Sequence, residues 1–343
     1  MTRKILSAVF AAALAVGMLG CTAITAEAPT ASEEAAATAT PTAAEEIAAT
    51  ETPVAATTYK TAFITRKLFS EQQAYAWKQF QQYCGDYGFT MDVFEGQNDV
   101  QNEEKAVSIC IAQDYDVIFI NPSDTEAIVP SLMAAKEAGV IIGMFASDLA
   151  TEYQQYRDFF CGVDDTMAGQ AAGQAFLDHF PDGGAIVEIG GPEGDDTQIK
   201  RHDGFVEKIE GSNITLLDSR NCSGWVTSDA ADIMEDLIDR YGDQIQGVFC
   251  HWDNGATGVI EALMEANMTG VYVVAADGCR AGYDQVKAGT QAVCIGENFT
   301  NMAIQSLMCA QAALEGQPFD AVNFIPFDVV TADNIGTFPY PEW

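Results

Sequence analysis

Basic residues are scarce in this sequence. Its 343 residues include 16 Lys and Arg and 3 His against 50 Asp and Glu, which gives a formal net charge of −34. From residue 59 onward, 14 basic residues face 44 acidic ones. This surplus excludes nucleic acid and anionic lipid headgroups as electrostatic partners. We interpret it as a solvated acidic surface, with a surface suited to a cationic ligand as the alternative.

Long apolar runs are missing too, apart from residues 5–19, which follow Arg3 and Lys4. That run is too short and too rich in Ala and Gly for a good spanning helix, so it predicts a secretory signal over residues 1–20. The ending Gly20-Cys21 is similar to the lipobox of bacterial lipoproteins, which implies lipidation of Cys21 and a membrane anchor. Leu19 departs from that pattern, and a plain signal peptide with a chance cysteine is the alternative.

The next segment lacks both basic residues and bulky apolar ones. Residues 22–57 consist almost wholly of Ala, Thr, Glu and Pro, with six Glu and no Lys or Arg. Such a composition buries too little apolar surface to offset the entropy of ordering. Residues 21–58 are therefore predicted to comprise the lipidated cysteine and a disordered acidic stalk that follows it in the chain.

Motifs for metals, cofactors and covalent catalysis are absent. The eight cysteines beyond Cys21 contain no CxxC pair, and eight cysteines allow 105 pairings, so no disulfide set is predicted. Cys84 and Cys110, expected on successive helices, are the only suspected neighbours. The three histidines have no metal-ligand spacing, and no Gly-x-Ser-x-Gly motif indicates a hydrolase. No cofactor, no metal and no enzymatic activity are expected.

What the chain does have is a regular alternation of short apolar runs with helical periods. Trp77, Phe80, Cys84 and Tyr87 recur at helical spacing before Gly88, a helix stop signal. Helices are predicted at 70–87, 100–113, 126–138, 166–180, 199–209, 228–241, 256–266, 282–288 and 301–314. Strands are predicted at 61–64, 91–94, 117–120, 140–145, 159–163, 185–189, 214–217, 248–250, 271–275 and 292–295.

This alternation predicts an α/β fold of parallel sheets covered by helices on both faces. Ten strands are awkward in one sheet, and the polar, aperiodic stretch 148–158 is where the first sheet is expected to end. Two doubly wound domains are the simplest arrangement. Ligands of such folds bind beyond the carboxyl ends of the strands, so a cleft is expected between the domains.

Four short motifs, taken in order along the chain, resemble those of a known protein family. They are Asn121-Pro122-Ser123-Asp124 after a strand, Arg201 ahead of Gly204-Phe205, Asp253 before a Gly/Ala-rich helix, and the run from Val273 to Gly278. Their order and spacing resemble the ribose/galactose-binding branch of the periplasmic sugar-binding proteins, the class I solute-binding proteins of ABC importers. The resemblance extends from residue 59 to about 330.

The resemblance implies two domains joined by a three-crossing hinge. It assigns 59–163 with 298–322 to an N-terminal lobe, and 164–297 with 323–343 to a C-terminal lobe. Proteins of this family close around a ligand and deliver it to a membrane permease. The calcium loop of the galactose-binding members is absent here, since only residues 181–184 occupy that turn.

The resemblance also assigns roles to individual residues. Arg201 matches an arginine that holds sugar hydroxyls, with an ion pair on a surface helix as the alternative. Asp277 matches a carboxylate that accepts from two hydroxyls, with a helix cap as the alternative. Trp225 matches an aromatic ring that packs on a sugar face, with core packing as the alternative.

Other matched positions depart from the family. Trp252 replaces a usual Asn before Asp253, which is itself expected to cap a helix, and Glu297 stands where Gln or Asn is common. The first loop differs most, and there Phe69, Gln72 and Gln73 are the candidate contacts. After the fourth strand, Phe145 and Asp148 stand in place of an Asp-Arg pair and complete the candidate ligand-binding set.

Together these features predict an extracytoplasmic solute-binding lipoprotein of an ABC importer that closes on a neutral sugar or similar polyol. Its expected partners are that small ligand, ABC permease subunits and a membrane reached through the lipid anchor, with no nucleic acid. One alternative is a ligand-sensing receptor of the same fold that feeds a chemoreceptor or histidine kinase. The other is an exported hydrolase.

Overall fold

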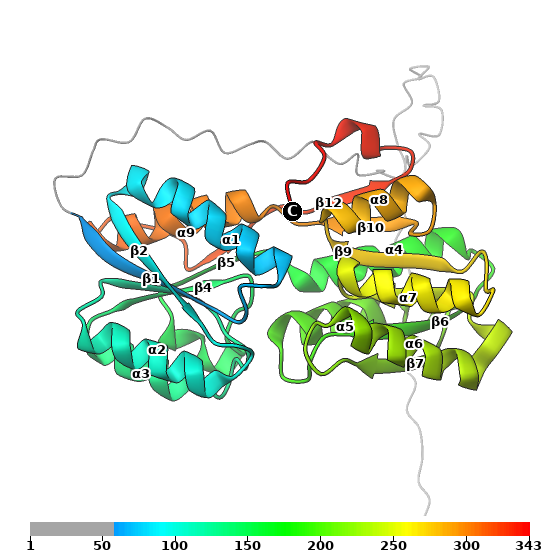
Figure 1. Cartoon of the computed structure of the whole chain (residues 1–343), viewed down its shortest axis with the longest axis horizontal. Helices are drawn as coiled ribbons and strands as arrows, with labels where there is room; N and C mark the ends of the chain where they lie inside the picture. The colour runs from blue at the N-terminus through cyan, green and yellow to red at the C-terminus, as the bar shows by residue number, and fades with distance from the viewer. Residues whose placement is uncertain (1–57) are drawn as a thin grey trace, which may run out of the picture. The chain divides into compact units, whose positions relative to one another are not determined.

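The computed structural model describes residues 58–343, and Figure 1 shows their elements. The predicted signal over residues 1–20, lipidated Cys21 and nearly all of the predicted stalk lie outside the described residues. The described chain forms two six-stranded sheets with orders β11-β5-β4-β3-β1-β2 and β12-β10-β9-β8-β6-β7. All pairings within them are parallel except that of β10 with β12. The predicted pair of doubly wound α/β sheets is thereby confirmed.

Helices cover both faces of each sheet. The first sheet consists of β1 (Tyr59–Thr65), β2 (Phe89–Glu95), β3 (Val117–Asn121), β4 (Ile141–Phe145), β5 (Phe159–Gly162) and β11 (Val322–Phe324). It packs against α1 (Glu71–Tyr83) and α9 (Phe299–Leu314) on one face and α2 (Val100–Ala112) and α3 (Val129–Glu137) on the other.

The second sheet is built in the same way. Its strands are β6 (Ala185–Gly190), β7 (Thr215–Asn221), β8 (Gly247–Cys250), β9 (Tyr272–Asp277), β10 (Val293–Gly296) and β12 (Asp328–Thr331). One face packs against α4 (Asp165–His179) and α5 (Asp196–Ile209), and the other against α6 (Thr227–Tyr241) and α7 (Asp253–Glu265). A smaller cluster holds α8 (Arg280–Ala288) against β10 and β12.

Element boundaries differ from the predicted ones where local hydrogen bonds compete with the periodic pattern. The first helix ends at Tyr83, and a 3₁₀ turn, η1 (Cys84–Tyr87), leads to Gly88 at φ 76°. The Asp124 carboxylate accepts from the backbone N–H groups of Glu126 and Ala127, and α3 starts only at Val129.

The stretch 148–158 does not end the first sheet, contrary to the sequence-based expectation. It contains the 3₁₀ helix η2 (Thr151–Tyr156), after which β5 pairs with β4 in the same sheet. The chain leaves the first sheet after β5, returns to it between β10 and α9, and leaves again between β11 and β12. The last passage follows Phe324, two residues beyond the expected boundary at 322.

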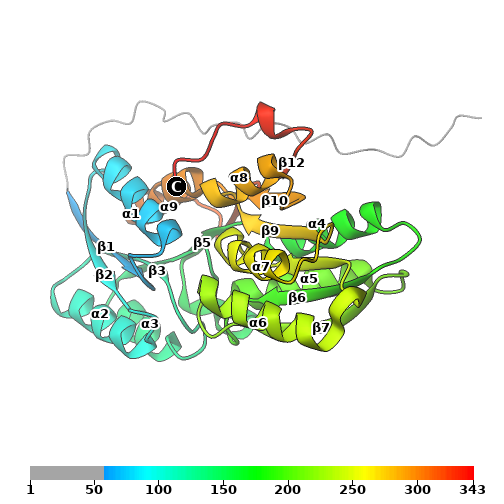
Figure 2. The same ribbon diagram turned by 45° about the vertical axis from the view of Figure 1, so that its right-hand side comes forward.

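The final residues return to the first sheet's helices, as the red segment in Figure 2 shows. The Trp343 indole stacks on Tyr75 of α1 at 5.9 Å between ring centroids and meets Phe299 edge-on at 5.3 Å. Lys78 Nζ lies 2.9 Å from a Glu342 carboxylate oxygen. This segment therefore spans from the second sheet to α1.

Cysteines in the described part of the chain are all free thiols. Cys84 packs on the α1 face of the first sheet and Cys110 lies in the cluster on the opposite face, so the suspected neighbours are separated by the sheet. The prediction that they lie together was wrong, because α1 and α2 cover opposite faces.

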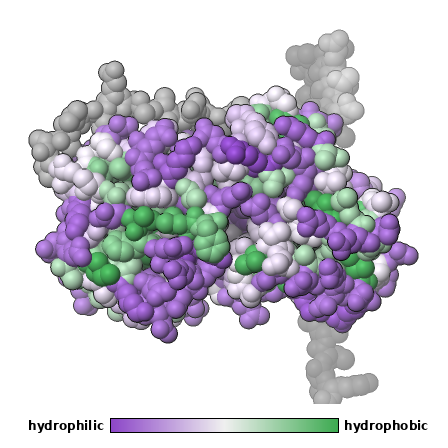
Figure 3. Space-filling model, viewed as in Figure 1, coloured by the Kyte–Doolittle hydropathy of each residue, from purple (hydrophilic) through white to green (hydrophobic). Residues whose placement is uncertain are grey.

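In residues 58–343 no helix is long and apolar enough to cross a membrane. The face in Figure 3 is largely hydrophilic, with hydrophobic patches among the hydrophilic residues.

Candidate ligand-binding site

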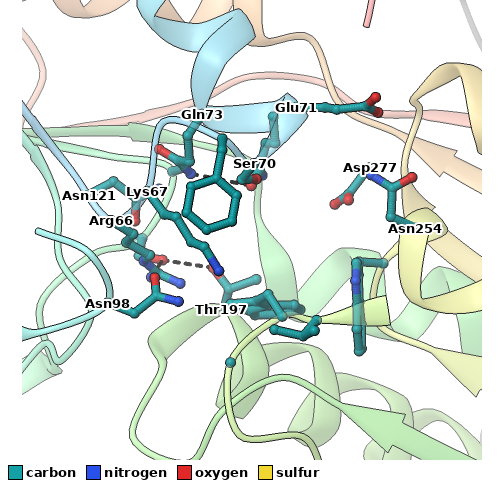
Figure 4. Close-up of a pocket in the computed structure, with 18 of the residues that line it drawn as sticks. Arg66, Lys67, Ser70, Glu71, Gln73, Asn98, Asn121, Thr197, Asn254 and Asp277 are labelled. Carbon is teal, nitrogen blue, oxygen red and sulfur yellow. Dashed lines mark hydrogen bonds between the residues drawn. The ribbon is translucent and has the colours of Figure 1, made fainter. Parts of the chain in front are cut away.

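A cavity of about 270 Å³ lies where the carboxyl ends of the two sheets face each other. Every segment that lines it follows or ends a strand, as expected for doubly wound folds. The first sheet contributes Arg66, Lys67, Phe69, Ser70, Glu71, Gln72, Gln73, Asn98, Asn121, Ala146 and Ser147. The second contributes Thr197, Arg201, Gly224, Trp225, Val226, Thr227, Trp252, Asn254 and Asp277, and Glu297 follows β10. Figure 4 shows how these walls face each other.

Arg201 of α5 lies in the cavity wall within a group of carboxylates. Its Nε donates to Asp165 at 2.9 Å, and its two terminal nitrogens donate to the His251 carbonyl and the Glu297 carboxylate. The Arg201 side chain is 3% exposed. We call each sheet with its helices a lobe, the first lobe holding β1 and the second holding β6. Three of the five Arg201 N–H groups are therefore held inside the second lobe, and two remain for other acceptors.

Burial is the largest influence on the pKa values of the three carboxylates around Arg201, those of Asp165, Asp277 and Glu297. It raises the pKa of Asp165 to about 7 against the opposing effect of Arg201. Burial and the nearby Glu297 charge also raise the pKa of Asp277 well above its ordinary range, and burial raises that of Glu297. One guanidinium thus offsets only part of the cost of placing three carboxylates out of water.

Trp225 stands in a loop between β7 and α6, as the sequence predicted, and lines the cavity with its ring half-buried. Its backbone has φ 42°, and its indole N–H donates to Asp195 at 2.9 Å. The ring meets Trp252 edge-on, with centroids 5.4 Å apart and an interplanar angle of 87°. Two perpendicular indoles therefore form an aromatic corner of the wall.

Trp252 precedes α7 and is almost fully buried, with no partner for its indole nitrogen among the described residues. Asp253 does not cap α7, although a cap was expected there. Its carboxylate accepts from the backbone N–H groups of Gly278 and Cys279, and also from Gln291. Burial raises the pKa of Asp253 to about 6 despite these bonds. Asp253 therefore fixes the turn that carries Asp277.

The candidates in the first loop all line the cavity but differ in how free they are. Gln73 is buried and accepts from the Thr65 hydroxyl, while its amide donates to Gln72 at 3.3 Å. Phe69 is 76% exposed, with Lys67 Nζ 3.9 Å from its ring centroid. Gln72 and Phe69 are thus more available to a ligand than Gln73.

Two candidates from the sequence, Phe145 and Asp148, are not among the residues that line this cavity. Phe145 is fully buried at the end of β4, where its ring meets Phe63 at 5.5 Å in the core. Asp148 forms a two-point ion pair with Arg157 and accepts from its neighbour's backbone N–H. The intervening Ala146 and Ser147 line the cavity instead, because the chain turns there with Ala146 at φ 63°.

Sequence reasoning missed several polar residues of the lining, chiefly Asn98, Asn121, Thr197 and Asn254. Asn121 is buried, and its side-chain oxygen has no hydrogen-bond partner among the described residues. A usable signal was present: each of these residues ends a strand or stands within seven residues of its carboxyl end.

Direct bonds join the two lobes beside the cavity. Arg66, which follows β1, pairs with Asp195 ahead of α5, and both are buried. Ser147 Oγ lies 3.0 Å from Thr197 Oγ1, and the Asp148 N–H donates to Asp196 at 3.2 Å. These contacts all involve the N-terminal end of α5 and the residue before it, which dock on the first lobe.

The histidines form no metal site. Glu188 on β6 accepts from Ser219 Oγ and bonds to ring nitrogens of His202 and His251 at 2.7 and 2.9 Å. Burial would raise the pKa of Glu188, but these bonds prevail and lower it to about 2. Within residues 58–343 no group of three or more His, Cys, Asp or Glu side chains is arranged to hold a metal ion.

Comparisons with known proteins agree with this geometry. The xylitol-binding protein of Mycolicibacterium smegmatis is 27% identical over 246 residues, which are 69% of this chain and 67% of that protein. The ribose import binding protein RbsB of Salmonella typhimurium is 24% identical over 234 residues, 68% of this chain and 77% of that protein. A galactofuranose-binding protein of known structure matches with a TM-score of 0.77 at 22% identity, covering 81% of this chain and 96% of that one.

A family model described as a periplasmic binding protein domain matches residues 55–318. That span is well over half of the sequence and includes both sheets except β11 and β12. It confirms the family that the motifs indicated. The chain therefore belongs to the periplasmic binding protein domain family.

Proposed function

We propose that this chain is the extracytoplasmic solute-binding component of an ABC importer and that it captures a small sugar or polyol by closure of two lobes. Its family is one of binding proteins, and the chain is not an enzyme. The observation that carries the proposal is a cavity at the carboxyl ends of two facing sheets, lined by aromatic rings, amides, hydroxyls and carboxylates.

The composition of the wall suits many hydroxyl groups on a small carbon skeleton. Side-chain amides of Asn98, Asn121 and Asn254 both donate and accept, and the two remaining N–H groups of Arg201 donate. The Trp225 ring offers an apolar face against which the C–H face of a sugar can pack. A volume of about 270 Å³ is at the lower end of ligand sites and fits a small molecule.

The names of the relatives support the same class of ligand. One is named for xylitol, a polyol, and another for ribose, a sugar. Sugars and polyols share the dense hydroxyl pattern that this wall can satisfy. The sequence predicts a neutral sugar or polyol. A sugar or polyol in which another group replaces one hydroxyl would use the same amides and rings.

We further propose that the two sheets are the mobile lobes, with β1–β5 and β11 in one and β6–β10 and β12 in the other, so the expected boundary at 322 moves to follow Phe324. The three passages of the chain between the sheets would serve as the hinge. In the arrangement described, both lobes wall the cavity, so closure brings ligand groups from both sides into contact. Ligand then selects the closed arrangement through contacts that only this arrangement makes.

Membrane anchoring through Cys21 completes the proposal. A diacylglycerol with its two acyl chains on the cysteine, followed by an acidic Ala/Thr/Glu/Pro segment, would hold the binding lobes near permease subunits. Replacing Cys21 with Ala in the full chain should move the exported protein from the membrane fraction to the soluble fraction. Persistence of Cys21→Ala in washed membranes would contradict a lipid anchor.

A thermal-shift screen over monosaccharides, polyols, nucleosides and amino acids tests the proposed function. A bound ligand raises the melting temperature by mass action, by about 2.7 kcal/mol of stability at 100 times Kd. Trp225→Ala should abolish the shift because it removes the stacking face while leaving a half-buried loop position. Arg240→Ala on the exposed surface of α6 is the control and should keep the shift. A shift with amino acids or nucleosides and with no sugar or polyol would sink the sugar assignment.

A further inference from the structure

The second-lobe wall of the cavity carries more acid than base. Arg201 is the one basic side chain among the second-lobe residues that line it, and Asp277 and Glu297 are the acidic ones. Asp165 adds a third carboxylate behind them. Asp165 and Glu297 each take a direct hydrogen bond from Arg201, whereas the nearest Asp277 oxygen lies 3.8 Å from Arg201. Asp277 is therefore the carboxylate whose charge is least compensated.

The backbone holds Asp277 in the wall at a conformational cost. Its φ is 112°, a region that L-residues rarely adopt, and the following Gly278 has φ 80°. A Cβ on Gly278 would press on Gly296, so the turn is tightly constrained. Asp253 bonds to the backbone N–H groups of the same turn. Figure 4 shows the Asp277 carboxylate beside Asn254 at the cavity.

The Asp277 carboxylate accepts no hydrogen bond from residues 58–343, and the residue is buried, with 6% of its surface exposed. A buried carboxylate without a donor is costly unless a positive charge or a proton joins it. Burial and the Glu297 charge raise its pKa well above the ordinary range, and the negative charge of Glu297 favours a positive group at this position. A cation supplied by the ligand would satisfy the carboxylate directly.

Neighbouring groups suit an ammonium rather than another anion. The Trp225 and Trp252 rings meet at the same wall, and indole faces attract cations, by about 0.5–2 kcal/mol. The Asn254 side chain adds an amide oxygen that can accept an N–H bond. Of the charged side chains on the first-lobe wall, Arg66 is paired with Asp195, and Lys67 and Glu71 have opposite signs, so that wall does not favour an anion.

We propose that the ligand is a polyhydroxylated compound bearing a protonated amine, an amino sugar or amino polyol, whose ammonium pairs with Asp277. This inference rests on the proposed function and narrows its ligand class. The surplus of acidic residues over the binding lobes would also concentrate such a cation near the cleft. A surface suited to a cationic ligand was the alternative interpretation of the acidic composition, and Asp277 is the residue of the site that would bind that cation.

Matched ligand pairs test the proposal by calorimetry on the purified wild-type chain. The probes are D-glucose with D-glucosamine, D-galactose with D-galactosamine, and D-glucitol with 1-amino-1-deoxy-D-glucitol. A charge-assisted bond to Asp277 predicts that the amine of at least one pair binds about tenfold or more tightly than its neutral partner. Asp277→Asn keeps the shape of the side chain and should remove that preference. Asp239→Asn, the same change on the exposed surface of α6, should keep it.

The outcomes separate this inference from the proposed function. A neutral sugar or polyol that binds more tightly than all three amines overturns the ammonium site while the proposed function stands. An amine preference that survives Asp277→Asn overturns the role of Asp277. Failure of the three amines and of every sugar and polyol in the wider screen overturns both. The wild-type comparison decides the first and third outcomes without any variant.

Discussion

Gly191 fixes where the Trp225 ring can lie. A Cβ built on Gly191 would overlap the six-membered part of the indole, so the ring packs directly on bare backbone. The indole N–H also donates to Asp195 at 2.9 Å. The two contacts come from one loop, and together they set the aromatic corner of the cavity. The orientation of the stacking face therefore depends on a residue that carries no side chain.

Replacing Gly191 with Ala should displace the Trp225 ring and weaken ligand binding. Overpacking of this kind costs about 1–3 kcal/mol, which corresponds to about 5- to 150-fold in Kd. Calorimetry with a ligand found in the screen measures the loss, and near-ultraviolet circular dichroism reports the moved indole. Gly85→Ala is the matched control, because nothing lies within 4 Å of a Cβ there and its φ is not positive. An unchanged Kd for Gly191→Ala would show that the ring position does not matter.

Single residues also explain why two candidates from the sequence lie outside the cavity lining. Asp148 looked available in the sequence, but its partner Arg157 arrives only after the intervening 3₁₀ helix. Phe145 ends a strand, and its ring points into the core while the next two residues reach the cavity. Which face a strand-end side chain takes depends on the turn that follows, and residue type alone does not report it.

At the scale of elements, long periodic segments were predictable and short exposed ones were not. Each predicted helix and strand corresponds to an element of the fold, because core-facing residues repeat at regular spacing. The strands β11 and β12 were missed. β11 has three residues of which two are exposed, and β12 pairs along one edge, so neither has an apolar run.

The candidate site follows from the same topology. Among the second-lobe candidates, Trp225, Trp252, Asp277 and Glu297 end a strand or follow one closely, and Arg201 lies in the helix after β6, so the strand order alone brings them together. The first-lobe lining was harder to predict because it rests on loop residues such as Asn98, at φ 55°. Loop backbone conformation is set by hydrogen bonds between distant segments, which a single sequence does not display.

At the scale of the whole described chain, the lobes touch through buried polar contacts beside the cavity. Arg66 donates to the Pro122 carbonyl and Ser147 within its own lobe and to Asp195 across the cleft. Asp195 in turn accepts from Trp225, so the same carboxylate joins the lobe contact to the aromatic wall. Packing of a ligand on Trp225 and closure of the lobes are thereby linked through one side chain.

Removing the guanidinium should shift the lobes toward an open arrangement. In Arg66→Gln the Asp195 carboxylate would stay buried without its cation in the closed form, and breaking such a pair costs about 3–5 kcal/mol. Opening lets water hydrate that carboxylate, so the cost falls on closure rather than on folding, and ligand affinity drops with the closed population. Small-angle X-ray scattering should show a larger radius of gyration than wild type at the same ligand concentration. Lys136→Gln, which breaks a partly exposed pair within the first lobe, should leave it unchanged.

The double variant Arg66→Gln/Asp195→Asn decides whether the pair itself controls closure. With both charges gone, neither lobe buries an unpaired ion, so the double variant should close more readily than Arg66→Gln alone. The Trp225 indole needs only an oxygen acceptor at position 195, and the new side-chain amide still supplies one. If the double variant is as open as the single one, the attraction between Arg66 and Asp195 is itself needed for closure. The remaining contacts between the lobes, among them Ser147 with Thr197, the Asp148 N–H with Asp196 and the Thr125 hydroxyl with the Gly194 carbonyl, are then too weak to hold the lobes closed without that ion pair.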